Sequence, residues 1–237
     1  MARLSGVPRR RASGGLIFRR HRVPDAPMSE PDLHAAFALR TPSDCQRLYR
    51  DWAASYDAGF AAGMDYRLPA HVAAAFLAGG GTGPVLDVGA GTGLVGAALR
   101  RLGWTGQIDG VDLSPQMLDQ ARAKQVYRNL IEADITRPLP LPGGYNGVAS
   151  SGTFTHGHVG PDAFGPLLAV AAPGALFALS VNLRVWAAAG FESALAALAG
   201  QLRDLQRIEV AIYGTAAARL DPDHAADRAM IVLFRKA

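Results

Sequence analysis

Short apolar runs alternate with helical patterns over the larger part of the chain. The runs fall at 85–88, 108–111, 130–133, 148–149 and 175–181, and helical spacing lies between them at 94–102, 114–123 and 161–172. This alternation predicts five parallel strands joined by crossovers. Two further runs, 205–213 and 229–234, are separated by a polar connection with little helical character, which predicts an antiparallel pair that closes the sheet.

The N-terminal part of the chain predicts helices. Thr41, Pro42 and Asp44 are typical of a helix start, with a hydroxyl N-cap, a proline at the first position and an acid in the first turn. The residues that follow at three- and four-residue steps share one face of this helix: Cys45, Leu48, Tyr49, Trp52 and Tyr56. A second helix is expected from Pro69 to the glycines at 79–81, which can end a helix.

The charge is unevenly distributed. The 237 residues are 49% hydrophobic, as in a globular protein, and the formal net charge is +4. Seven of the 24 basic residues and one of the 20 acidic residues precede Met28, so the remainder carries 17 basic and 19 acidic residues. Charge therefore does not favour a nucleic acid or membrane partner. We expect residues 1–27 to be a disordered basic tail or the result of an early start codon, with a transit peptide or nucleic-acid arm as the alternative.

Cysteine content and hydropathy bear on the compartment. Cys45 is the only cysteine, so no intramolecular disulfide can form and nothing requires an oxidising environment. Pro173 and Glu192 interrupt the two Ala-rich stretches, and neither reaches the twenty or so apolar residues of a membrane span. We expect a cytoplasmic protein without a membrane span.

A glycine-rich loop is the most specific feature of the sequence. The segment VLDVGAGTGLVG, residues 85–96, is an expected strand that runs through Gly89, Gly91 and Gly93 into an expected helix. Glycines there permit tight turning and close approach of a ligand to the backbone. Ligands of doubly wound sheets bind at the C-terminal ends of the strands, so we expect a ligand at this loop.

The acid before the loop distinguishes between two cofactor classes. Gly91, Gly93 and Gly96 match G-x-G-x-x-G, so a nicotinamide or flavin dinucleotide must be considered. Asp87 would repel the diphosphate of a dinucleotide at the helix N-terminus. S-adenosylmethionine carries no phosphate and presents an ammonium and a sulfonium group, which an acid beside the loop can help to hold.

Two further acids end the next two expected strands. Asp112 lies 19 residues past Gly93, where a carboxylate can accept hydrogen bonds from both ribose hydroxyls. Ser114 and Pro115 then form an expected N-cap and first helical residue. Asp134 follows the third strand, close to where an adenine amino group would lie.

With these residues in place, the chain resembles class I S-adenosylmethionine methyltransferases over roughly residues 45–237. Their motifs are matched in order by LDVGAGTG, GVDLS and EADI, which contain Asp87, Asp112 and Asp134. The segments DWAASYD, SPQMLDQARAK and SGTFTHGHV are similar to the methyltransferase-like proteins related to the Williams-Beuren syndrome region product.

The resemblance implies a Rossmann-like α/β fold, a three-layer sandwich whose seven-stranded, mostly parallel sheet has its last strand antiparallel. We expect an N-terminal helical segment at 28–80 and the methyltransferase domain at 81–237. The expected cofactor is S-adenosyl-L-methionine, with S-adenosyl-L-homocysteine as product. The expected cofactor contacts are Asp87, Gly89, Ala90, Gly91, Gly93, Asp112, Leu113, Met117, Asp134, Ile135, Ser151 and Tyr56.

The acceptor side offers candidate catalytic residues and no metal site. A general base is needed only if the acceptor holds a proton at neutral pH, and the candidates are His158 and His156, with Thr153, Tyr56 and Tyr66 expected nearby. Each also has a structural interpretation, as a loop histidine or a packed aromatic. The two histidines lack further ligands with site-like spacing, so no metal is expected. Residues 185–199 form an apolar helical segment that either covers the acceptor or packs on the core.

Three functions are compatible with the sequence. The first is methyl transfer to an acceptor that is a small molecule or, as a second choice, a protein side chain. The second is a nicotinamide-dependent oxidoreductase, which Asp87 and Asp134 disfavour. The third is an adenosyl-ligand-binding module without turnover. The acceptor and the oligomeric state are not specified by the sequence.

Overall fold

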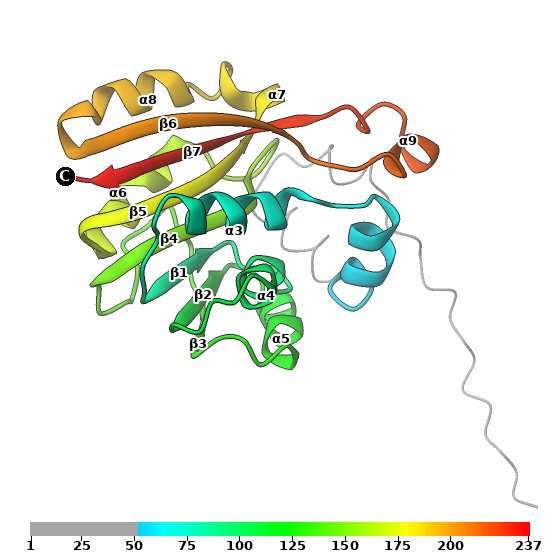
Figure 1. Ribbon diagram of the computed structural model, residues 1–237, viewed down its shortest axis with the longest axis horizontal. Helices are drawn as coiled ribbons and strands as arrows, with labels where there is room; N and C mark the ends of the chain where they lie inside the picture. The colour runs from blue at the N-terminus through cyan, green and yellow to red at the C-terminus, as the bar shows by residue number, and fades with distance from the viewer. Residues whose placement is uncertain (1–51) are drawn as a thin grey trace, which may run out of the picture.

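The computed structural model describes residues 52–237 as a sheet flanked by helices (Figure 1). The expected basic tail, the helix start at Thr41 and the aromatic positions before Trp52 lie outside the described residues. The strands are β1 (Val85–Val88), β2 (Ile108–Asp112), β3 (Asn129–Glu132), β4 (Tyr145–Phe154), β5 (Ala171–Asn182), β6 (Leu202–Ala211) and β7 (Arg228–Lys236). The longer helices are α3 (Leu68–Ala78), α4 (Leu94–Arg101), α5 (Pro115–Ala123), α6 (Phe164–Val170) and α8 (Phe191–Ala197). The short ones are a π-helix η1 (Tyr56–Ala61), α7 (Leu183–Trp186), α9 (Ala217–Leu220) and the 3₁₀ turns η2 (Pro161–Ala163) and η3 (Ala199–Gln201).

The seven strands form one sheet in the order β3-β2-β1-β4-β5-β7-β6. The first five strands pair in parallel, and β7 pairs antiparallel with both β5 and β6. The expected fold class is confirmed, including the antiparallel pair at the end of the chain. The strand order reverses between β1 and β4, which is where a doubly wound sheet opens a crevice for a ligand.

The period-two alternation of each strand divides the core into two layers. In β1, Leu86 and Val88 face the same side as Phe164 and Phe191, whereas Val85 packs with α3 and α4 on the other side. The two layers bury most of the aromatic and branched residues of the strands, a large favourable contribution to folding. Helices therefore cover both faces of the sheet (Figure 1).

Local signals place most helix ends as expected. Ser114 caps α5, since its Oγ accepts a hydrogen bond from the Met117 N–H at 3.3 Å, and Pro115 is the first helical residue. Helix α3 ends at Gly79, and Gly80 follows with φ of +70°. Among the described residues, none of the helices is long and apolar enough to cross a membrane.

The segment at 185–199 is broken where a single helical segment was expected. Gly190 has φ of +74° and separates α7 from α8. Phe191 and Leu195 are fully buried against the sheet, and Trp186 stacks on Phe191 with ring centroids 5.9 Å apart. None of these residues lines the cavity described below, so the structure supports the packed helix of the two alternatives.

Candidate functional site

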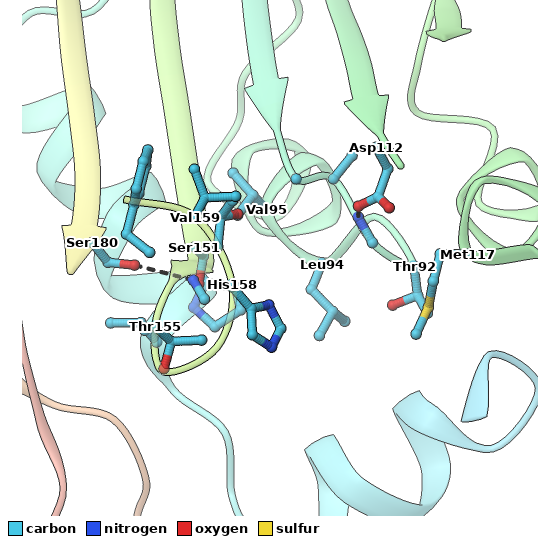
Figure 2. A pocket seen from close by; sticks show the side chains of 18 of the residues that line it. Thr92, Leu94, Val95, Asp112, Met117, Ser151, Thr155, His158, Val159 and Ser180 are labelled. Atoms are coloured by element: carbon cyan, nitrogen blue, oxygen red, sulfur yellow. Dashed lines mark hydrogen bonds between the residues drawn. The ribbon is translucent and has the colours of Figure 1, made fainter. Parts of the chain in front are cut away.

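A cavity of about 270 Å³ opens at the C-terminal ends of β1, β2, β4 and β5. Figure 2 shows His158 and Ser151 on one side of it, and Asp112 and Met117 on the other. Of the expected cofactor and catalytic residues, those that line it are Tyr56, Gly89, Ala90, Gly91, Asp112, Leu113, Met117, Asp134, Ile135, Ser151, His156 and His158. The structure thus gathers residues from eight separate places in the sequence around one space.

The glycine loop has a backbone that only glycine adopts easily. Gly89, Gly91 and Gly93 have φ of +64°, +53° and +91°. A Cβ atom on Gly89 would lie 2.0 Å from Thr153 Oγ1, so the loop packs directly against β4. A Cβ atom on Gly91 would meet no atom nearer than 4.0 Å and would occupy space beside the cavity. Gly93 is the residue that precedes α4 and does not itself line the cavity.

Asp112 is the carboxylate best placed to bind a ligand. Its Oδ2 accepts a hydrogen bond from the Gly91 N–H at 2.8 Å, and its Oδ1 accepts one from the Ser114 N–H at 2.8 Å. Each carboxylate oxygen can accept a second hydrogen bond, so the group is held in place and still has acceptor capacity. Burial raises the pKa of Asp112, and these backbone hydrogen bonds oppose that rise.

Beside Asp112 the cavity wall is apolar and ends in a second carboxylate. Met117 and Ile135 are almost fully buried and form part of this wall together with Leu113. Asp134 accepts hydrogen bonds from the Thr136 N–H and hydroxyl at 2.9 and 2.7 Å. The Thr136 hydroxyl is the main cause of a lowered pKa, which keeps the Asp134 carboxylate ionised. An apolar slot bordered by an acceptor suits a heteroaromatic ring with an amino group.

Asp87 does not line the cavity, contrary to the sequence-based expectation. Alternation along β1 turns its side chain to the α4 side of the sheet, where it is fully buried. The Tyr127 hydroxyl donates to Asp87 Oδ2 at 2.6 Å and accepts from the Gly96 N–H at 3.3 Å. Asp87 therefore supports the start of α4 through Tyr127, and its side chain is not part of the cavity wall.

The segment at 52–67 is tied to the glycine loop by a charged network. Thr92 Oγ1 donates to Asp57 Oδ1 at 2.6 Å, while Lys124 Nζ lies 2.5 Å from Asp57 Oδ2 and 2.6 Å from the Thr92 carbonyl oxygen. This network holds η1 beside the cavity. No role was predicted for Asp57 or Lys124 from the sequence, although they end the segments DWAASYD and SPQMLDQARAK, which carry the family resemblance.

Aromatic side chains form the wall next to the network. Tyr56 packs on Phe60 with ring centroids 5.0 Å apart, and Phe60 in turn contacts Tyr66 and Tyr213 at 5.6 and 6.1 Å. Tyr56 thus packs on Phe60 and also lines the cavity, and its role in the site stays a prediction. The cavity is also lined by Trp52, Phe60, Ile212 and Tyr213, which were not predicted from the sequence as site residues.

The loop after β4 supplies the remaining candidates. Ser151 Oγ lies 3.4 Å from the Tyr66 hydroxyl, and the Gly152 N–H donates to Ser180 Oγ at 3.1 Å. Burial, with a smaller contribution from His156, lowers the pKa of His158 to about 4. His158 is therefore neutral at pH 7 and a weaker base than expected. Within residues 52–237 no three His, Cys, Asp or Glu side chains are grouped as metal ligands.

Comparison with known proteins agrees with this geometry. Residues 85–174, which span β1 to the start of β5, match the family model for a methyltransferase domain. This part of the chain therefore resembles a methyltransferase domain. The chain is also 39% identical over 150 residues to human methyltransferase-like protein 27, a match that spans 60% of this chain and 60% of that protein.

Solved structures show the same fold at low sequence identity. A Methanococcus maripaludis protein assigned as an S-adenosyl-L-methionine-dependent methyltransferase aligns with a TM-score of 0.56 and 15% identity, covering 81% of this chain and 94% of that one. The cyclase SpnF aligns with a TM-score of 0.54 and 19% identity, covering 72% and 80%. These similarities show the fold alone, because one fold can carry many different chemistries.

The cavity fits S-adenosylmethionine. Asp112 offers acceptors for ribose hydroxyls, Leu113, Met117 and Ile135 border an apolar slot, and Gly91 leaves room for close approach of a ligand. One Asp87 oxygen, Oδ1, is buried and has no hydrogen-bond partner among the described residues. When this carboxyl loses its proton, it places negative charge beneath the loop, which favours a cationic group above it over a diphosphate.

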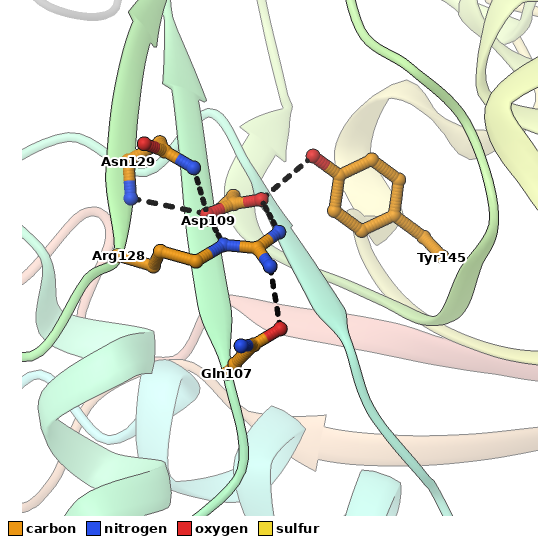
Figure 3. Close-up of polar contacts among 5 residues, drawn as sticks. All are labelled: Gln107, Asp109, Arg128, Asn129 and Tyr145. Carbon is orange, nitrogen blue, oxygen red and sulfur yellow. Dashed lines mark hydrogen bonds and ion pairs between the residues drawn. The ribbon is translucent and has the colours of Figure 1, made fainter.

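Two buried aspartates should change the stability of the protein with pH in opposite directions. Burial raises the pKa of Asp87 to about 7, against the opposing hydrogen bond from Tyr127. Asp109 is also buried, but Arg128, Tyr145 and Asn129 surround it with donors (Figure 3) and outweigh the burial effect, so its pKa is lowered.

We expect Asp87→Asn to remove a pH dependence of stability. Asp87 in the folded protein keeps its proton to higher pH than it does in the unfolded chain. Its contribution to the unfolding free energy is therefore complete below about pH 3.9 and is lost as the pH rises to about 7. The unfolding free energy of the wild type, relative to Asp87→Asn, should therefore fall between pH 4 and pH 7.5, by roughly 1.4 kcal/mol per pKa unit. Urea unfolding at several pH values measures it. Asp109→Asn is the control, because the unfolding free energy of the wild type relative to this variant should change only below about pH 4. If this relative free energy changes equally with pH for both variants, the raised pKa of Asp87 is refuted.

Proposed function

We propose that this protein transfers a methyl group from S-adenosylmethionine to a small-molecule acceptor. The observation that supports this most directly is the Asp112 carboxylate, fixed by the Gly91 and Ser114 N–H groups at the edge of a cavity that continues to the ends of β4 and β5. The cavity thus has one end suited to a nucleoside and another end with room for a second molecule. Segment 52–67 borders it, which favours a small acceptor over a folded protein.

The residues of the chain would act mainly by positioning. Bound S-adenosylmethionine supplies a methyl group on a sulfonium, which a nucleophile displaces directly. Asp112 and the apolar slot beside Met117 would fix the adenosyl part, while the loop after β4 and the aromatic wall would hold the acceptor in line. Positioning and exclusion of water account for several kcal/mol of barrier lowering in reactions of this kind.

Two other functions make different predictions for the same cavity. A nicotinamide-dependent oxidoreductase would bind NAD or NADP, and its diphosphate would lie above the Asp87 carboxyl, which repels it once deprotonated. A binding module would retain an adenosyl ligand without turnover. The cyclase SpnF shares the fold, so the fold does not by itself separate catalysis of methyl transfer from other chemistry.

We expect S-adenosylmethionine and S-adenosylhomocysteine to raise the melting temperature and NAD and NADP to have no effect, because only a ligand that binds the folded state stabilises it. Thermal unfolding is measured with each compound at a concentration about a hundred times a Kd in the micromolar range. A compound that binds should then stabilise the folded protein by about 2.7 kcal/mol relative to one that does not. Mass spectrometry of ligand retained on the purified protein is the independent measurement. Stabilisation by NAD alone would overturn the proposed cofactor, and cofactor binding without methyl transfer to any acceptor would favour the binding module.

A further inference from the structure

The strand order separates the cavity into two ends. Asp112 ends β2, and Asp134 follows β3, so both carboxylates lie on one side of β1. Ser151 near the end of β4 and Ser180 near the end of β5 lie on the other side. We call the second region the acceptor end, defined by Tyr56, Tyr66, Ser151, His158, Ser180, Asn182 and Tyr213, all of which line the cavity.

Aromatic rings from three parts of the chain form a fixed wall at the acceptor end. Tyr66 and Tyr213 contact one another with ring centroids 5.8 Å apart, and both contact Phe60. An isolated backbone bridge also joins Tyr66 and Tyr213. Because the rings support each other, their exposed faces are held in place before a ligand arrives. Such faces bind flat, apolar groups by stacking or edge contacts.

The polar groups at the acceptor end are neutral. Burial raises the pKa of Tyr66 to about 12, so its phenol stays protonated, and burial lowers the pKa of His158 to about 4, so its imidazole stays uncharged. Ser151, Ser180 and Asn182 add hydroxyl and amide groups. Among the described residues that line the whole cavity, none is a lysine, arginine or glutamate. Both aspartates that line it, Asp112 and Asp134, lie on the other side of β1 from the acceptor end.

A charged acceptor would lose hydration here without gaining a counter-ion from the side chains of the acceptor end. Burial of an unpaired carboxylate, phosphate or ammonium costs several kcal/mol, whereas an uncharged aromatic body gains free energy by leaving water. A single hydroxyl group on that body can be hydrogen-bonded by the neutral donors and acceptors present.

We propose, on the basis of the proposed methyl transfer, that the acceptor is an uncharged aromatic compound whose hydroxyl oxygen is methylated. The hydroxyl oxygen forms a bond to the methyl carbon while the carbon–sulfur bond breaks and its electron pair stays on sulfur. The hydroxyl proton passes to a ring nitrogen of His158 and then to solvent. His158 is a weak base, but a hydroxyl oxygen that is gaining a methyl group becomes strongly acidic, so a neutral imidazole suffices.

The test compares three probes of one shape and different charge: naphthol, naphthoate and naphthylmethylammonium. Calorimetry first measures the Kd of S-adenosylhomocysteine and then that of each probe with the product bound. We expect naphthol to bind at least about tenfold more tightly than either charged probe. With S-adenosylmethionine, mass spectrometry should detect methoxynaphthalene.

Variants connect the result to the acceptor end. Tyr66→Ala should weaken naphthol binding about tenfold and leave the Kd of S-adenosylhomocysteine nearly unchanged, because the lost ring belongs to the acceptor end of the cavity. Trp186→Ala, which removes an aromatic packed on Phe191 outside the cavity, should leave naphthol binding unchanged. His158→Ala should bind naphthol and lower the rate of methoxynaphthalene formation by at least about tenfold.

The outcomes separate this inference from the function on which it rests. If S-adenosylhomocysteine binds but naphthol does not, or naphthoate or the ammonium probe binds more tightly, the acceptor class is wrong and the methyltransferase proposal stands. Methylation of the ammonium probe's nitrogen in preference to naphthol would also overturn it. Failure of S-adenosylhomocysteine to bind would overturn the proposed function and this inference with it.

Discussion

Asp112→Ala should weaken S-adenosylhomocysteine binding by about a hundredfold, which corresponds to about 2.7 kcal/mol. Two losses contribute. The ribose hydroxyls lose a charged acceptor, and the Gly91 and Ser114 N–H groups, each 2.8 Å from the carboxylate, lose the partner that shapes the loop. Asp112→Asn should weaken the binding of S-adenosylhomocysteine less, because its amide oxygen can still accept a hydrogen bond from one of the two N–H groups.

Calorimetry on the purified variants measures this effect, and thermal unfolding shows whether the domain is intact. Asp119→Ala is the matched control, since Asp119 lies on α5, is exposed and pairs with Arg122 on the surface. It should bind the product as the wild type does. Wild-type affinity in Asp112→Ala would place the ribose elsewhere and remove the main support for the proposed cofactor.

The sheet and the glycine loop could be predicted because their signals are local. Each of the five parallel strands contains a short apolar run, and Asp112 ends β2 while Asp134 lies two residues after the end of β3. Parallel strands bring their C-terminal ends to one edge, so adjacency in space followed from order in the sequence. The same reasoning placed His158 in the loop after β4, where it lines the cavity.

Asp87 shows where that reasoning fails. Its position before the loop predicted a contact with the ligand, but the outcome depends on which face of β1 carries the odd-numbered residues. Tyr127, 40 residues away, supplies its hydrogen bond at 2.6 Å, and nothing in the local sequence indicates that pairing. The protonation of His158 could not be predicted either, because its pKa depends on burial by side chains from other segments.

The acceptor wall was harder to predict for a related reason. Tyr66 and Tyr213 are far apart in the sequence and meet only through the fold. The ion pair of Asp57 with Lys124 joins residues 67 positions apart. Long-range pairs of this kind have no periodic signal, so sequence analysis found the segments through family resemblance without assigning the contacts.

Gly89→Ala should abolish measurable S-adenosylhomocysteine binding and destabilise the domain more than any other single change in the loop. Two costs add. An alanine at φ of +64° is strained by roughly 1–2 kcal/mol, and its Cβ would lie 2.0 Å from Thr153 Oγ1, which must then move. Thr153 Oγ1 is itself held by Ser150 Oγ and the Val88 carbonyl oxygen at 2.9 and 3.1 Å, so it cannot move without breaking these contacts.

Gly103→Ala isolates the second cost. Gly103 follows α4 with φ of +89°, and a Cβ there would meet no atom within 4 Å, so it shares the backbone strain without the clash. It should lower the unfolding free energy by only about 1 kcal/mol and retain full product affinity. Calorimetry and urea unfolding of both variants give the two quantities, and the excess loss in Gly89→Ala measures the close approach of the loop to β4. If both variants bind the product equally well, the Gly89–Thr153 contact does not shape the site, because the loop then reaches its binding conformation without it.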